Sequence, residues 1–384
     1  MRILIVTDIS GHMPGGVPAE TRRLVDGLVQ NGHVVALASD VPLGDAINIL
    51  HVPIIIPVKP SLANDVRDAL AYFKPDFVHL MCMSSKGVML LASVLHDHPW
   101  ALTVHSVPPY ESKLNRWHGH ERLHYGARAL RFALNGLAWR WIFSRGIVPM
   151  SIVHSEFVKD IVLAYGASRD FVKSIPLCFD SSMSQRVVDT SPVNTDAPLL
   201  VTVGGFAHSK GQHDVVKALP ALLEKFPRLR YQIIGEIRDE SYVSYLYRLA
   251  HNLNVLDHFI ITPDLDEPAK QKVLEHADVY IQPSHEEGFC LAYAEAAAIV
   301  LRLVGTNTGA MAAISDGDAG ARVIPTKTPA AIAAAVAELM KTDLPPLIMR
   351  EREARLGEIF SSAGYLRSHE ELYVFLSRQT RTGR

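Results

Sequence analysis

Short apolar runs alternate with amphipathic helical stretches along almost the whole of this 384-residue chain. The first run, within Met1 to Asp8, is apolar at successive positions, which is typical of a parallel strand buried on both faces. We therefore expect it near the middle of a sheet. Similar runs predict strands at residues 33–39, 49–56, 77–81, 101–106, 149–154, 172–176, 199–205, 231–235, 259–262, 278–282, 302–306 and 321–325. Strands separated by helices predict an α/β fold with mostly parallel sheets.

The length of the chain indicates two domains, because a single hydrophobic core rarely grows beyond about 250–300 residues. A stretch rich in Ser, Asp, Thr and Pro, Ser181 to Pro198, shows little periodicity and is the expected linker. We therefore predict a Rossmann-like domain at residues 1–185 and a second one at residues 195–363.

The composition argues against several classes of protein. With 20% charged residues and a formal net charge of −2, nothing global points to nucleic acid. The cysteines Cys82, Cys178 and Cys290 form no Cys-x-x-Cys pair, so we expect neither a disulfide framework nor a cysteine zinc site. The first apolar run is too short for a signal peptide, and no run of about 18 apolar residues could span a bilayer. A cytoplasmic protein that is not integral to a membrane is expected.

The stretch at residues 278–295 predicts a ligand site. Its β-favouring run stops at a proline, Gly288 permits a tight backbone, and good helix formers begin at Leu291. Ligands of open α/β sheets bind beyond the carboxyl ends of strands, where a helix N-terminus favours an anion. Glu287 and Glu295 could accept paired hydrogen bonds from vicinal sugar hydroxyls. The stretch therefore predicts a sugar-nucleotide site; the alternative is an ordinary turn with solvated glutamates.

The segment Glu287-Gly-Phe-Cys-Leu-Ala-Tyr-Ala-Glu295 resembles the E-x7-E motif of glycosyltransferase family 4, whose members are retaining enzymes. The resemblance implies the GT-B architecture, in which two Rossmann-like domains face a cleft and a last helix, here about residues 364–384, returns to the first domain. It also implies that Glu287 contacts sugar hydroxyls and Glu295 the ribose. The donor-binding residues between them would be Gly288, Phe289, Cys290 and Leu291.

Further segments resemble motifs of the same family. Phe206-Ala-His-Ser-Lys-Gly211 is similar to the G-R-x-x-x-x-K-G segment, which implies that Lys210 binds the diphosphate and that Gly205 lies beside it. A lysine before a helix is mispaired with the helix dipole, so an anion between them is expected; the alternative is a solvated lysine. Thr103-Val-His105 resembles the T-x-H segment, whose histidine faces the donor sugar, although most lone histidines are structural. The resemblance thus implies that His105, Lys210 and Glu287 are catalytic.

The first glycine-rich loop contains Gly15 and Gly16 before a helix expected at 19–30, but has no G-x-G-x-x-G motif. This loop is either a flexible turn or, as the resemblance implies, a segment whose backbone contacts the donor phosphates. The chain departs from the family pattern at three places. Gly205 replaces a common arginine, Val300 and Arg302 replace a usual Gly and Pro, and Ala310 replaces the second glycine of a pair that begins at Gly309.

Residues 113–145 carry a local excess of positive charge, with Lys113 and six arginines against Glu121, and tryptophans between them. One interpretation is a long amphipathic helix pair with solvated arginines. The other is a face for an anionic acceptor or for acidic lipid at the inner surface of the membrane. The triplets Asp264-Leu-Asp266 and Asp316-Gly-Asp318 fit caps or turns, so we assign no metal.

These features together favour a retaining glycosyltransferase that moves a sugar from a nucleoside diphosphate sugar to a hydroxyl acceptor. The expected partners are the donor and that acceptor, with no nucleic acid, no metal and no other cofactor. Two alternatives stay open. One is a sugar-nucleotide epimerase, which would turn over donor without acceptor, and the other is a non-catalytic sugar-nucleotide sensor.

Overall fold

The computed structural model describes residues 1–7, 16–39, 49–53, 61–81, 83–105, 134–178, 196–237, 239–345 and 347–382. These residues fall into two compact units. Unit 1 comprises the described residues up to 178 together with 362–382, and unit 2 comprises those from 196 to 361. The expected linker lies almost wholly outside the described residues.

Unit 1 is built on a seven-stranded parallel sheet with the order β3-β2-β1-β4-β5-β6-β7. The central strand β1 is buried from Ile3 to Val6, which confirms the interpretation of that apolar run. Its strands are β1 (Arg2–Thr7), β2 (Val34–Ser39), β3 (Ile49–Pro53), β4 (Phe77–Met81), β5 (Trp100–Thr103), β6 (Ser151–Val153) and β7 (Val172–Ser174).

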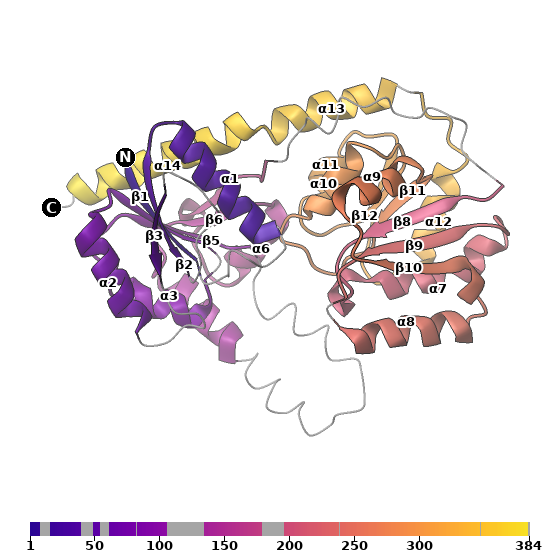
Figure 1. Ribbon diagram of the computed structural model, residues 1–384, viewed down its shortest axis with the longest axis horizontal. Coiled ribbons are helices and arrows are strands. Elements are labelled where there is room, and N and C mark those ends of the chain that lie inside the picture. The colour runs from indigo at the N-terminus through magenta and orange to yellow at the C-terminus, as the bar shows by residue number, and fades with distance from the viewer. Residues whose placement is uncertain are drawn as a thin grey trace. The chain divides into compact units, whose positions relative to one another are not determined.

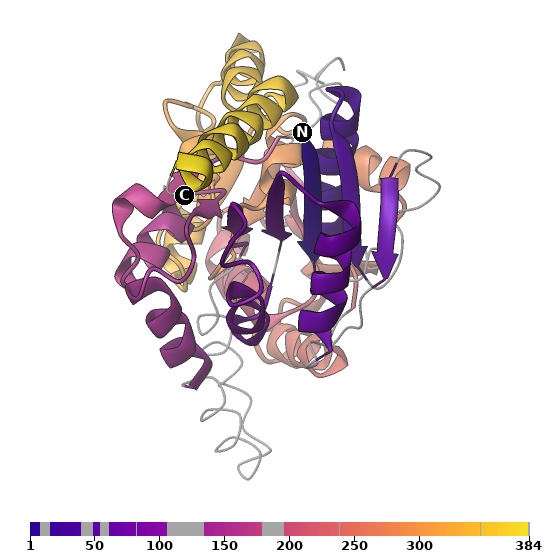
Figure 2. The ribbon, with the colours of Figure 1, turned by 90° about the vertical axis from the view of Figure 1, so that its left-hand side faces the viewer.

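The helices of unit 1 flank this sheet (Figure 2), and apolar side chains of several of them are buried in one core with those of the strands. They are α1 (Gly16–Gln30), α2 (Leu62–Phe73), α3 (Ser85–Ala92), a helix at 134–144, α6 (Glu156–Ala164) and the long C-terminal α14 (Ser362–Thr382). The helix α14 packs on β4 and α1: Tyr373 stacks on Phe77 with ring centroids 4.4 Å apart, and Leu366 contacts Gly27. A Cβ at Gly27 would approach the methyl groups of Leu366 to 2.5 Å, so a larger residue there would require the Leu366 side chain to move.

Unit 2 is built on a six-stranded parallel sheet with the order β10-β9-β8-β11-β12-β13 (Figure 1). Its strands are β8 (Leu199–Val203), β9 (Arg230–Gly235), β10 (Phe259–Pro263), β11 (Val279–Gln282), β12 (Leu303–Thr306) and β13 (Ala321–Ile324). The helices are α7 (Gln212–Leu223), α8 (Glu240–Asn252), α9 (Glu267–Glu275), α10 (Leu291–Ala297), α11 (Met311–Ser315), α12 (Pro329–Leu339) and α13 (Leu347–Ile359). The chain leaves β8 on one side and returns beside it as β11, which creates the switch point where such sheets bind ligands.

All the predicted strands are present, within a few residues of their expected bounds. Two helix starts were predicted wrongly. The helix α1 begins at Gly16 instead of residue 19, because Pro18 is tolerated in a first turn, where a backbone N–H has no helical partner. The sequence also predicts a helix at 215–226, but α7 begins at Gln212, directly after Gly211 with φ +67°.

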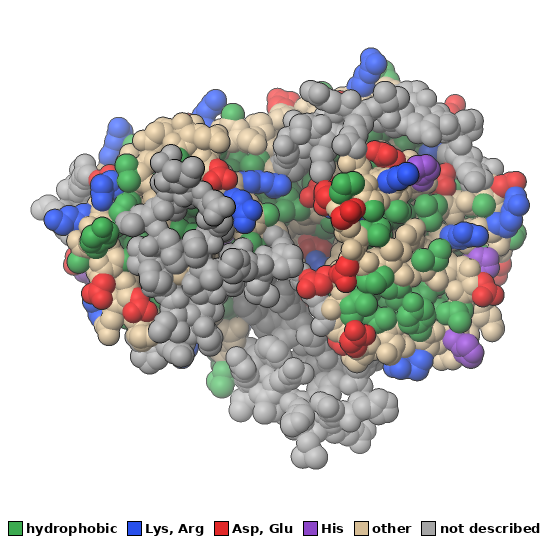
Figure 3. All heavy atoms as spheres, viewed as in Figure 1, with side chains coloured by type: hydrophobic (Ala, Val, Ile, Leu, Met, Phe, Trp, Pro, Cys, Tyr) green, Lys and Arg blue, Asp and Glu red, His purple; other side chains and the backbone are tan. Residues whose placement is uncertain are grey.

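Charged side chains of both signs are interspersed on the face of unit 2 seen in Figure 3, and hydrophobic side chains gather near α8. Exposed apolar residues of this region include Tyr247, Leu256 and Ile260. Mixed charges of this kind create no field of a single sign over that face.

Candidate active site

The loops that follow β8 and β11 meet at the switch point of unit 2. The first contains Gly205 and Lys210, and the second contains Glu287. Lys210 Nζ donates to both carboxylate oxygens of Glu287, at 2.8 and 3.0 Å. The structure therefore joins two of the predicted site residues that are far apart in sequence.

A chain of hydrogen bonds fixes the Glu287 carboxylate. Tyr280 OH donates to Gln282 at 2.6 Å, Gln282 donates to Ser284 Oγ at 2.8 Å, and Ser284 donates to Glu287 Oε1 at 2.7 Å. The Glu287 side chain is 9% exposed and that of Lys210 27%. The lysine is therefore the more accessible member of the pair, and the carboxylate is held from behind.

Gly211 lets the two loops approach each other. It has φ +67°, and a Cβ there would lie 2.0 Å from the carbonyl oxygen of Pro283. The backbone N–H of His285 also donates to Ser209 O at 2.7 Å, and His285 Nε2 contacts the buried Asp214 carboxylate at 2.6 Å. A larger residue at Gly211 would therefore force the two loops apart.

Gly309 and Ala310 close the other side of the Glu287 loop. A Cβ at Gly309, where φ is +58°, would meet the Phe289 carbonyl oxygen at 2.6 Å. Ala310 donates its backbone N–H to that same oxygen at 2.8 Å. The φ of Ala310 is −96°, so this position does not need the positive φ that favours glycine. Alanine can therefore replace the second glycine of the family pattern here.

Cys290 occupies an unusual backbone conformation at the start of α10. Its φ is +81°, in the left-handed region that non-glycine residues rarely adopt. Burial, and secondly the charge of Glu287, raise the pKa of the Cys290 thiol well above its usual value. The thiol is therefore protonated and unsuited to act as a nucleophile.

The remaining donor residues of the motif lie on or next to α10. Phe289 is buried, Gly288 and Leu291 are partly exposed, and Glu295 contacts Lys270 of α9 at 3.4 Å. Gly205 accepts a hydrogen bond on its carbonyl from the buried Gln212 at 3.1 Å. The structure shows where these residues lie, and their contact with a donor remains a prediction.

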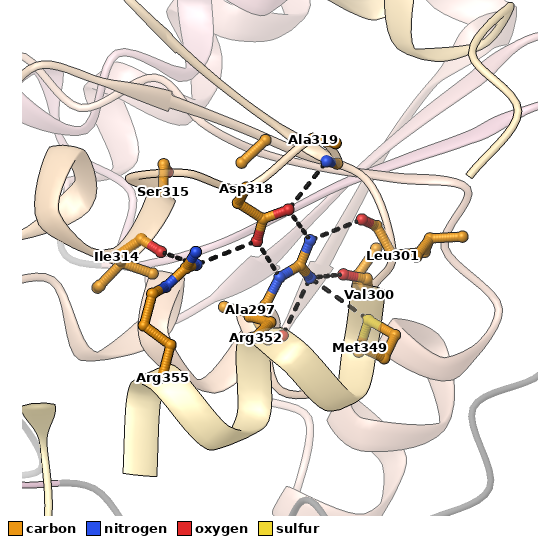
Figure 4. Close-up of polar contacts among 12 residues, drawn as sticks. Ala297, Val300, Leu301, Ile314, Ser315, Asp318, Ala319, Met349, Arg352 and Arg355 are labelled. Atoms are coloured by element: carbon orange, nitrogen blue, oxygen red, sulfur yellow. Dashed lines mark hydrogen bonds and ion pairs between the residues drawn. The ribbon is translucent and has the colours of Figure 1, made fainter. Parts of the chain in front are cut away.

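The end of α10 is held by an arginine from α13 (Figure 4). The buried Arg352 guanidinium donates to the carbonyls of Ala297, Val300 and Leu301 at 3.1, 2.7 and 2.9 Å. It also pairs with Asp318 through two nitrogens. Arg302, likewise buried, donates to Leu339 O at 2.9 Å and to Thr342 O at 3.2 Å. Arginine contacts thus support the turn in which Val300 and Arg302 replace the usual residues.

The Asp-x-Asp triplets contribute to local structure as predicted. Asp266 caps α9 by accepting from the backbone N–H of Ala269 at 2.8 Å. Asp318 accepts from the backbone N–H of Gly320 at 2.9 Å, in addition to its ion pair with Arg352.

The predicted residues of the first domain lie in unit 1. His105 follows β5, and its Nε2 contacts Glu20 on α1 at 2.7 Å. Gly16 is the exposed first residue of α1, so it is helical and not part of the loop that we predicted. Gly15 lies outside the described residues.

Sequence models of two known families match this chain. The model for Glycosyltransferase Family 4 matches residues 14–182, and that for Glycosyl transferases group 1 matches residues 185–358. The chain belongs to glycosyltransferase family 4. Phosphatidyl-myo-inositol mannosyltransferase of Mycobacterium tuberculosis strain H37Rv is similar to this chain. The two are 24% identical over 373 residues, which cover 93% of this chain and 91% of that protein. The protein is therefore a glycosyltransferase enzyme.

Solved structures share the fold of this chain. Sucrose-phosphate synthase from Thermosynechococcus elongatus superimposes with a TM-score of 0.77 at 16% identity and full coverage of both chains. The Anabaena protein HepE in complex with UDP-glucose gives a TM-score of 0.71 at 14% identity, covering 98% of this chain and 99% of that one. At such low identities these likenesses show the fold alone, which is the predicted GT-B arrangement of two Rossmann-like domains.

Several polar residues around the predicted ones could not be identified from the sequence. Glu20 lies on an ordinary amphipathic helix, and Lys270 and Arg352 belong to helices with no motif. Each contacts a partner at least 25 residues away, so no local spacing could have revealed it.

None of the described helices is long and apolar enough to cross a membrane.

Proposed function

We propose that this family 4 member is a retaining glycosyltransferase that uses a nucleoside diphosphate sugar as donor. The observation that carries the proposal is the Lys210–Glu287 pair at the switch point of unit 2. It places a cation suited to a diphosphate directly against a carboxylate suited to sugar hydroxyls. The motif helix that carries Glu295, the ribose candidate, follows the same loop.

In this proposal the bond between the anomeric carbon and the diphosphate breaks while the acceptor oxygen bonds to that carbon on the same face. The leaving diphosphate takes the proton of the acceptor hydroxyl, so no protein nucleophile is required. Lys210 stabilises the negative charge that builds on the leaving group, the kind of electrostatic effect that is usually the largest in such catalysis. No metal ion and no other cofactor take part. His105 accepts a hydrogen bond from a sugar hydroxyl.

The relatives suggest which donors to test. One relative is named as a GDP-mannose-dependent mannosyltransferase, from Mycolicibacterium smegmatis, and is 30% identical over 190 residues, 43% of this chain and 48% of that protein. HepE has been solved with UDP-glucose. We propose a thermal-shift screen of GDP-mannose, UDP-glucose and their parent diphosphates. We expect the melting temperature of the protein to rise with the guanine nucleotides or with the uracil nucleotides, but not with both. Ligand at 100 times its dissociation constant stabilises the folded protein by about 2.7 kcal/mol.

Transfer to an acceptor, with the donor's anomeric configuration kept in the product, would complete the test. Inverted configuration would contradict the retaining mechanism. Donor epimerised without any acceptor would favour an epimerase. Tight donor binding without transfer or hydrolysis over hours would favour a sensor.

We infer further that the acceptor is reached at an anionic lipid surface. The helix at 134–144 exposes Leu134, Leu137 and Trp141, which are 55, 62 and 51% exposed. Their spacing puts them on one face of the helix, and Arg140 and Arg145 are exposed nearby. An apolar stripe with basic neighbours is typical of a helix that lies in a membrane interface. The relatives that are named as phosphatidylinositol mannosyltransferases support a lipid acceptor.

Replacing Trp141 with aspartate should weaken sedimentation with anionic vesicles at least tenfold, because it removes an apolar anchor and repels the lipid charge. Binding of the unchanged protein should fall with added salt, since each basic residue near the surface contributes about 1 kcal/mol. Tyr72→Asp is the matched control, because Tyr72 is also an exposed aromatic of unit 1, 75% exposed on α2. Equal loss in both variants, or no sedimentation at low salt, would contradict the membrane proposal.

A further inference from the structure

Glu20 places a buried carboxylate between two histidines of unit 1. Its Oε2 lies 2.7 Å from His105 Nε2, and its Oε1 lies 2.8 Å from His154 Nε2. Tyr365 OH of α14 donates to Oε1 at 3.2 Å. The side chains of Glu20 and His154 are 2 and 3% exposed, and that of His105 is 11% exposed. Almost no water reaches this carboxylate, so its neighbours must neutralise it.

The contacts of His154 identify where its protons lie. Its Nδ1 is 2.8 Å from Ile175 O, and a carbonyl oxygen only accepts, so Nδ1 carries a hydrogen. Its Nε2 lies at an ion-pair distance of 2.8 Å from Glu20 Oε1, although not in hydrogen-bond geometry. A bare nitrogen would be repelled by the carboxylate there, so Nε2 carries a hydrogen as well. Burial alone would lower the pKa of His154, but the charge of Glu20 and the hydrogen bonds raise it above its usual value. His154 is therefore the imidazolium partner of Glu20.

The other titratable groups around Glu20 add no charge to the Glu20–His154 pair. His79 of β4 bonds two hydroxyls, those of Tyr373 and Thr103, and burial lowers its pKa well below the usual value. Burial also lowers the pKa of His369 on α14 to about 4. Burial would raise the pKa of Glu20, but His154 and His105 hold it well below the usual range. One carboxylate thus faces one imidazolium.

His105 must then be neutral, because a second buried cation would be uncompensated. Its Nε2 faces the Glu20 carboxylate and so carries the hydrogen, which leaves Nδ1 as a bare acceptor. That Nδ1 is buried and has no hydrogen-bond partner among the residues that the structure describes. Buried polar atoms nearly always have a partner, so this nitrogen is poised for a donor that the described chain does not supply.

We propose that Glu20 and His154 are positioning residues that fix His105 in the Nε2–H tautomer, so that its Nδ1 accepts a hydrogen bond from a substrate hydroxyl. His154 keeps Glu20 ionised, and Glu20 in turn orients the imidazole of His105, as carboxylates and carbonyls behind functional histidines do elsewhere. The identity of the hydroxyl rests on the proposed function, whereas the proton positions do not.

Nitrogen NMR of protein with ring-15N-labelled histidine tests the proton positions without any substrate. Signals of the two histidines are assigned by their loss in His105→Gln and His154→Gln. At pH 7.5 we expect His154 to carry hydrogens on both nitrogens and His105 on Nε2 alone. A neutral His154, or a hydrogen on His105 Nδ1, would overturn the proposal even if the protein transferred no sugar. The proton positions are read from the unaltered chain, and the two variants serve only to assign its signals.

Glu20→Gln keeps the size of the side chain and removes its charge. We expect its His154 to lose the second proton at neutral pH and its kcat/KM to fall about tenfold or more, as is common when the group behind a functional histidine is lost. Glu370→Gln is the matched control, because it removes the charge of another carboxylate of unit 1 that contacts a histidine, His33, at 2.9 Å. Equal loss in both variants would overturn the proposal.

A bound metal ion is the competing explanation, since the ligand atoms of Glu20, His105 and His154 lie within 4.8 Å of one another. Elemental analysis of the purified protein distinguishes a bound metal ion from the proposed arrangement of protons. We expect no stoichiometric transition metal. One zinc per chain that is lost in Glu20→Gln would overturn the assignment of protons.

Discussion

Replacing Asp318 with alanine should lower the free energy of unfolding by about 3–5 kcal/mol, as is usual when one partner of a buried ion pair is removed. Asp318 and Arg352 have side chains that are each 1% exposed. Without the carboxylate, the Arg352 guanidinium would be a buried charge that only carbonyl oxygens neutralise in part. Urea unfolding followed by circular dichroism measures the change.

The control is Arg322→Ala, which removes the exposed Arg322–Glu338 pair of the same unit. It should cost less than about 1 kcal/mol, because solvent already screens that pair. Changing both Asp318 and Arg352 to apolar residues should recover part of the lost stability, since no charge then stays buried. A loss as small as that of the control would contradict the assignment.

The pH dependence of the Asp318 effect has a definite sign. Burial would raise the pKa of Asp318, but its bonds and charge interaction with Arg352 hold it below the usual value. A carboxyl group with a lowered folded pKa stabilises the protein above its unfolded pKa of about 3.9. That stabilisation is lost as the pH falls through the folded pKa. The difference between the unaltered protein and Asp318→Ala should therefore shrink below about pH 4.

The sheets could be predicted from the sequence because buried parallel strands are apolar at every position. The run from Ile3 to Val6 needs no knowledge of its neighbours to be assigned to the interior. Helix starts were less predictable, since they depend on single backbone conformations. The start of α7 follows from the left-handed Gly211, which in turn is required by the close approach of the Pro283 carbonyl from another loop.

The residues of the candidate site also differ in how far they could be predicted from the sequence. Lys210, Glu287 and Glu295 stand in contiguous motifs, so they could be found from the sequence alone. Glu20 and His154 could not, because they reach His105 from different elements and show no spacing relative to it. The contact of Lys210 with Glu287 was also unexpected, since the motifs suggested separate roles at the diphosphate and the sugar.

Lys210→Ala should weaken binding of the nucleoside diphosphate by about ten- to a hundredfold and leave binding of the nucleoside unchanged. The lysine neutralises phosphate charge, and a hydrogen bond to a charged group contributes roughly 1.5–3 kcal/mol. Isothermal titration calorimetry with both ligands measures the difference. Lys225→Ala, at an exposed lysine just after α7, should change neither affinity. Equal loss for nucleoside and diphosphate would contradict the assignment.

Glu287→Gln should distinguish diphosphate binding by Lys210 from sugar binding by Glu287. In the ligand-free protein, Glu287 competes with a diphosphate for the Lys210 ammonium group at 2.8 Å. Loss of its charge should therefore strengthen binding of the free diphosphate by about threefold to tenfold, because a partly exposed ion pair contributes about 1 kcal/mol. The sugar nucleotide should gain less or bind more weakly, since the carboxylate that binds its sugar hydroxyls is gone.

Glu295→Gln should weaken binding of both the free diphosphate and the sugar nucleotide, because both ligands contain the ribose. If Glu287→Gln weakened both ligands equally while Glu295→Gln affected the sugar nucleotide alone, the roles of the two glutamates would be exchanged.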